Sequence, residues 1–155
     1  MYQINQIADY VILRLSEGGD KTLNSLKLQK LLYYIQSWHL AFHKKPIIQD
    51  SFQAWVHGPV NREVFDRFKD RMLFFPIIED DILDKEISQK ISDEDKLHID
   101  LVLESYSKFS GVELEQMTHG EEPWLKARSG FRPNERCEVK IDEILMGDYY
   151  RSRLQ

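Results

Sequence analysis

Apolar side chains recur every three or four positions between residues 22 and 43, which is the spacing of one face of a helix. The stripe comprises Leu28, Leu31, Leu32 and Ile35 and is continued by Trp38 and Phe42. Pro46 follows shortly after the last of these positions. The pattern predicts a helix from about Thr22 to His43 whose apolar stripe joins a hydrophobic core.

A second set of positions in the same segment carries polar side chains at the same period. Lys27, Lys30, Tyr34 and Ser37 fall together on another side of the predicted helix. Charged helical positions often do no more than solvate a helix. The alternative hypothesis is that the two lysines and the tyrosine form an outer stripe that contacts a partner.

Helical spacing and start signals continue along the chain. Residues 4–15 keep the helical period, and Gly18-Gly19 ends that helix. A third helix is expected to begin near Pro59, because proline is well tolerated at a first helical position. Later helices are indicated by a partial capping box at 92–95, a full one at 110–113, a proline at 123 and an apolar pattern over 141–149.

Two segments rich in aromatic and β-branched residues, 47–56 and 74–78, favour extended structure. The acidic stretch 79–90 lacks periodicity and is interpreted as a mobile surface connection. No repeat or linker divides the chain. We therefore expect a mainly α fold: a single compact domain over residues 1–155, with about six or seven helices. A short two-stranded β element, in which 47–56 pairs with 74–78, would complete it.

Composition restricts the class of protein. The 155 residues are 42% hydrophobic and 30% charged, with a net charge of −5 and a single cysteine, Cys137. No apolar run reaches the ~18 residues that a membrane span needs, and no basic-then-apolar secretory signal is visible. We expect a cytoplasmic protein without disulfides or membrane contact. The acidic balance argues against a dedicated nucleic-acid binder.

Catalytic and cofactor motifs are missing from the sequence. His39 and His43 lie four residues apart on one predicted helix, but no third metal ligand accompanies them. Cys137 has no base placed beside it. We expect no catalytic residue, metal or cofactor. An enzyme acting on a small molecule stays open only if the turns carrying His57, His119 and Glu121 converge on a pocket.

Two turns combine a histidine with a large aromatic side chain. The first, Ala54-Trp55-Val56-His57-Gly58-Pro59-Val60, precedes the predicted third helix. The second, Thr118-His119-Gly120-Glu121-Glu122-Pro123-Trp124, lies between two later helices. Tryptophans are common interface anchors, but large aromatic side chains are also common in cores. Both interpretations apply to Trp55 and Trp124.

Taken in order, the segments 26–34, 54–60 and 114–124 resemble the Panacea domain, the SocA-like antitoxin domain also known as phage-associated GepA-like. The resemblance spans nearly the whole chain. It implies a type II antitoxin that neutralises a cognate protein toxin by direct binding. It also leaves open a proteolytic adaptor that delivers the toxin to a cytoplasmic protease, and a regulatory or DNA-associated binding module.

The hypothesis for the toxin-binding surface combines the polar helix stripe with the two turns. Its residues are Lys27, Lys30, Tyr34, Trp55, His57, His119 and Trp124. Nucleic-acid binding by this chain alone is not expected, and the sequence carries no signal for an oligomeric state.

Overall fold

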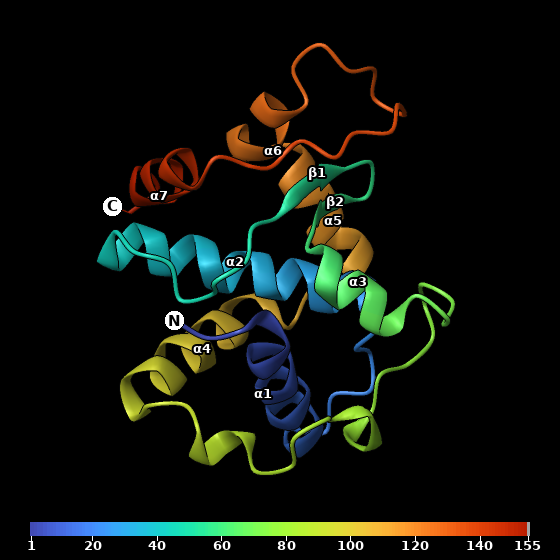
Figure 1. Ribbon diagram of the computed structural model, residues 1–155, viewed down its shortest axis with the longest axis vertical. Coiled ribbons are helices and arrows are strands. Elements are labelled where there is room, and N and C mark those ends of the chain that lie inside the picture. The colour runs from blue at the N-terminus through green and yellow to red at the C-terminus, as the bar shows by residue number, and fades with distance from the viewer. Residues whose placement is uncertain (155) are drawn as a thin grey trace.

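The computed structural model describes residues 1–154. It is mainly α, with one small antiparallel sheet, as the sequence predicts (Figure 1). The elements in order are α1 (Ile4–Glu17), α2 (Ser25–His43), β1 (Gln53–Trp55), β2 (Gly58–Val60), α3 (Arg62–Phe68), η1 (Glu79–Asp81), η2 (Ile87–Gln89), α4 (Asp93–Tyr106), α5 (Gly111–His119), α6 (Glu122–Ala127) and α7 (Glu143–Arg151). No helix in the described range is long and apolar enough to cross a membrane.

Helix α2 crosses the middle of the molecule, with α6 and α7 on one side and α1 and α4 on the other (Figure 1). It packs against α1, α4, α5, α7 and the β2 strand. As a result, nearly all of its residues are buried, polar ones included. Over most of its length the helix has no solvated face, so the polar side chains there must find partners inside the protein.

The polar side chains of α2 satisfy the backbone of neighbouring irregular segments. Gln36 accepts from the amides of Ile47 and Ile48 at 3.0 and 2.9 Å and donates to the Ile48 carbonyl at 3.0 Å. Gln29 forms a reciprocal pair with the backbone of Asn61, at 3.0 and 2.9 Å. These bonds fix chain segments that have little regular structure of their own.

The third helix begins later than the sequence predicts. Asn61 caps α3 by accepting from the amide of Val64 at 3.2 Å, whereas Pro59 lies in β2. The expected start near Pro59 is therefore wrong. Asparagine is a strong N-cap, and the preceding residues are already paired in the sheet. The apolar side chains of Phe65 and Met72 do not join the core: they are 39% and 79% exposed.

The pairing predicted between 47–56 and 74–78 is also wrong. β1 pairs with β2, with Trp55 opposite Gly58, so a two-residue turn joins the strands. Ile77 donates its amide to the Leu23 carbonyl instead. A tight turn closes at a far lower entropic cost than a contact between segments twenty residues apart, which favours the local hairpin.

The segment 79–90 is more structured than expected. It contains η1 and η2 and buries Ile82 and Ile87. A buried ion pair between Arg67 and Asp9, at 2.6 Å, anchors it. Asp9 accepts from two backbone amides of this segment, and Arg67 donates to the carbonyl of Asp81. Asp9 and Arg67 therefore hold the segment on α1 and α3.

Candidate partner-binding groove

The polar stripe predicted on the outside of α2 is buried. Lys27, Lys30, Tyr34 and Ser37 are at most 1% exposed, so the expectation of an outer face is wrong. Lys27 shows the reason: its Nζ donates to the Ser107 carbonyl at 2.6 Å and to Thr22 at 2.9 Å, and pairs with Asp20 at 3.3 Å. The elements packed over this side of α2 are far away in the sequence and invisible to periodicity.

Lys30 lies beneath the turn of the hairpin. Its Nζ donates to the Pro59 carbonyl at 3.1 Å, and a Cβ built on Gly58 would lie only 2.5 Å from its Cε. Burial lowers the pKa of Lys30 to about 7, and the nearby negative charge of Glu115 opposes this shift. A lysine in this position supports the turn above it and is not available for direct contact.

Tyr34 belongs to an interior cluster with a carboxylate at its centre. Tyr34 and Tyr150 both donate to Oε1 of Glu121, at 2.8 and 2.7 Å. Burial raises the pKa of Glu121, while the two tyrosine hydrogen bonds oppose that rise. Burial also raises the pKa of Tyr34, and Glu121 adds to this effect. The cluster joins α2, the α5–α6 turn and α7.

The structure brings the two tryptophan-bearing turns together. Trp124 is 6% exposed and donates from its indole Nε1 to the Trp55 carbonyl at 2.9 Å. His119 stacks on Trp124 with ring centroids 4.1 Å apart, and its buried Nε2 has no hydrogen-bond partner within residues 1–154. These contacts lie inside the corner between the hairpin and α5–α6.

Three of the proposed contact residues reach the surface at least in part, and one of them is His119, which is half-buried. The side chain of His57 is 65% exposed and lies 3.3 Å from Glu115. Trp55 is half-buried, with Arg62 stacked over its ring at 4.8 Å. The predicted residues thus cluster around one corner, except for Lys27 at the start of α2, but most of them hold that corner together from within.

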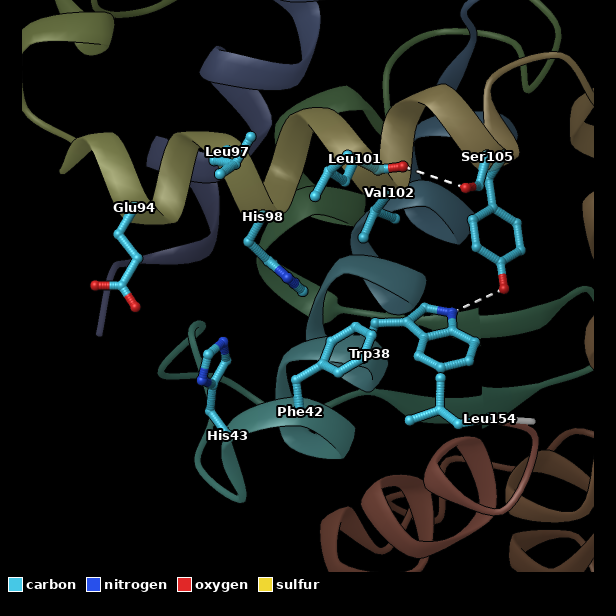
Figure 2. Close-up of a pocket in the computed structure, with 11 residues that line it drawn as sticks. Trp38, Phe42, His43, Glu94, Leu97, His98, Leu101, Val102, Ser105 and Leu154 are labelled. Carbon is cyan, nitrogen blue, oxygen red and sulfur yellow. Dashed lines mark hydrogen bonds between the residues drawn. The ribbon is translucent and has the colours of Figure 1, made fainter.

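An open groove with a volume of about 740 Å³ lies elsewhere, between the second half of α2 and α4 (Figure 2). Its walls are apolar and carry Trp38 and Phe42 from α2 and Leu97 and Leu101 from α4. Phe42, Leu97 and Leu101 are 55%, 60% and 54% exposed. Phe42 was expected in the core, but it lies one residue before the end of α2 and lines the groove.

The polar groups of the groove are few. Trp38 donates its indole N–H to the Tyr106 hydroxyl at 2.8 Å, as Figure 2 shows. Close to one end, His98 hydrogen-bonds to the Ile35 carbonyl at 3.0 Å. Burial lowers the pKa of His98, and the neighbouring His43 lowers it further, so the ring is neutral at pH 7. The groove therefore offers mainly apolar contact.

Sequence reasoning missed this groove. Leu97 and Leu101 are four residues apart on α4, off the buried face formed by Ile99, Val102 and Leu103. Two leucines outside the core stripe of an amphipathic helix are the signal that was available. Exposed apolar side chains that gather in one patch often mark an interaction site.

The residues that would have indicated an enzyme have separate roles. Glu121 accepts hydrogen bonds from two tyrosines. His119 stacks on Trp124, and His57 lies against Glu115. Within residues 1–154, no three histidine, cysteine or acidic side chains are arranged to hold a metal ion. The groove between α2 and α4 presents an open, mainly apolar surface.

A comparison with protein families gives one match. A family model described as antitoxin SocA-like, Panacea domain, matches residues 28–125. The match covers more than half of the chain and runs from α2 to α6, so it includes the hairpin, both tryptophan turns and both walls of the groove. No curated protein and no solved structure matches the chain.

Proposed function

The chain belongs to the SocA-like antitoxin family that is defined by the Panacea domain, and from this membership we propose that it is the antitoxin of a type II toxin–antitoxin system. It neutralises a cognate protein toxin by direct binding, in the cytoplasm. Family membership is the observation that carries this proposal. The proposed role as an antitoxin agrees with a sequence in which no catalytic motif was found.

The toxin docks in the groove between α2 and α4. Fully burying a completely exposed leucine or phenylalanine contributes about 1.5–3 kcal/mol. Phe42, Leu97 and Leu101 are 55%, 60% and 54% exposed, so covering each of them contributes roughly half of that figure. Aromatic and apolar anchors of this kind carry most of the affinity of many interfaces. A volume of about 740 Å³ accommodates several side chains of one partner segment.

The test is co-expression with the toxin encoded beside this chain. Leu97→Asp combined with Leu101→Asp places two charges in the groove, and we expect affinity for the toxin to fall by on the order of 100-fold. Cell protection should then be lost. Calorimetry with the purified pair measures the affinity, and circular dichroism verifies that the variant is folded.

A matched control carries two aspartates elsewhere. Leu125→Asp with Ile144→Asp replaces residues that are 48% and 78% exposed and lie outside the groove, and it should protect cells fully. If the groove variant protects as well as this control, the toxin does not dock in the groove.

A toxin whose half-life shortens when the chain is present would indicate a proteolytic adaptor. That result would overturn neutralisation by binding alone.

A further inference from the structure

A second, smaller pocket lies at the other end of α2, under the hairpin and beside α3. Its volume is about 210 Å³. Ligand and cofactor sites usually measure about 300–1,000 Å³, so this pocket suits a single large side chain. Trp55, Phe65 and Leu73 form apolar walls, and the Trp55 and Phe65 rings meet edge to face at 4.9 Å.

The charged residues that line this pocket are all basic or titrate as bases. They are Lys30, His57, Lys69 and Arg71, with no aspartate or glutamate among the lining residues. This is notable in a chain whose net charge is −5. The pocket therefore combines an apolar interior with a surplus of positive charge.

Part of this charge has no counter-ion. Arg71 pairs with Asp81 and His57 with Glu115. The lysines that form ion pairs within residues 1–154 are Lys27, Lys90 and Lys96, so the exposed Lys69 has no ion-pair partner in this range. Because the pKa of Lys30 is about 7, Lys30 is charged in only part of the molecules at neutral pH. Lys69 is exposed, so its ammonium group can contact an anion directly.

We propose that this pocket receives one aromatic side chain of a protein partner, with an acidic residue next to it in the partner's sequence. The aromatic ring fills the space between Trp55, Phe65 and Leu73, and the carboxylate lies against Lys69. The inference rests on the proposed function only in naming the toxin as the protein that supplies this segment. The pocket is then a second anchor, separate from the groove.

The test uses small peptides and needs no toxin. Acetyl-Phe-Glu-amide is titrated into the intact protein and followed by the three tryptophan indole N–H signals in NMR, assigned with Trp→Phe variants. We expect the Trp55 signal to shift and the Trp38 signal to stay. Acetyl-Phe-Gln-amide should bind about threefold more weakly, which is the scale of one exposed ion pair, and acetyl-Ala-Glu-amide should cause no shift.

The variant Lys69→Gln should remove the preference for Glu over Gln, whereas Lys126→Gln, an exposed lysine on α6, should leave it unchanged. Equal binding of both Phe dipeptides to the native protein would overturn the proposal, as would shifts at Trp38. A short oligothymidylate that shifts Trp55 more than the peptide does would reassign the pocket to nucleic acid. Because no toxin is used, these results are independent of the groove experiment.

Discussion

The buried lysines show how the environment of a residue sets its chemistry. Lys30 and Lys27 occupy equivalent positions in the helical pattern, yet Lys27 has an aspartate, a threonine and a carbonyl as partners, while Lys30 has one carbonyl. Periodicity grouped them correctly with Tyr34 but could not show whether solvent or protein covers them. The same limit applies to Phe42 and Leu97, whose exposure depends on where neighbouring helices end.

At the residue scale, Lys30 should make stability depend on pH. Its folded pKa of about 7 lies below the ordinary value of 10.5, so the unfolded chain binds more protons between these limits. The free energy of unfolding should therefore rise with pH from about 7 to 10, by up to about 1.4 kcal/mol per pH unit. Urea denaturation at pH 7.5, 8.5 and 9.5 measures this slope.

In Lys30→Met the rise with pH should disappear, because no titrating group remains at that position. Lys126→Met, at an exposed position, serves as the control and should keep the native slope. An identical slope in all three proteins would mean that Lys30 does not titrate in this range. Tyr33 and Tyr34, whose pKa values are raised by burial, weaken folding only above about pH 10.

At the scale of elements, the hairpin depends on one glycine. Gly58 has φ +97° and lies against Lys30 and Thr118, at 2.5 and 2.9 Å from an added Cβ. The prediction of a turn here was right, but the element that follows it is a strand, since Asn61 caps α3 three residues later. Turn residues indicate where the chain reverses. Contacts with α2 and α5 decide which secondary structure follows the turn.

Gly58→Ala should destabilise the fold by about 2 kcal/mol or more, because it adds a steric overlap to the strain of a positive φ. Gly19→Ala is the matched control: it has φ +79° but nothing within 4 Å of the added Cβ. That variant should lose only about 1 kcal/mol. Thermal unfolding of both variants gives the comparison, and equal losses would rule out close packing as the cause.

At the scale of the whole molecule, α2 is the central helix and packs against α1, α3, α4, α5, α7 and β2. Gln36 is the clearest case, because it holds the 47–48 backbone and also donates to Glu143 of α7 at 2.9 Å. Gly147 lets α7 approach the backbone of Leu40, with 3.3 Å from an added Cβ to that carbonyl. The 47–48 segment and α7, which both pack against α2, are therefore expected to unfold together.

Gln36→Leu should lower stability by about 2–4 kcal/mol, since it leaves buried backbone amides without an acceptor. Hydrogen exchange should accelerate in α7 as well as around Ile48. Gln116→Leu, at an exposed position on α5, should change neither. Acceleration confined to the 47–48 segment would show that α7 is held independently of α2.

The sequence by itself determined the helical class, the extent of α1, the end of α2, the reciprocal capping box of Ser110 and Glu113 and the resemblance to the antitoxin family. These follow from local spacing and short-range hydrogen bonds, which a single segment carries within itself. The start of α2 was predicted near Thr22, but the helix begins at Ser25 because Asn24 caps it. Only the tertiary structure decided which polar residues are buried, which strand pairs with β1, and where apolar side chains stay exposed. Burial, strand pairing and exposure all depend on segments that are distant in sequence and meet only after folding. As a result, the residues that identify the family lie mostly inside the protein, and the candidate docking surfaces lie largely beside these residues.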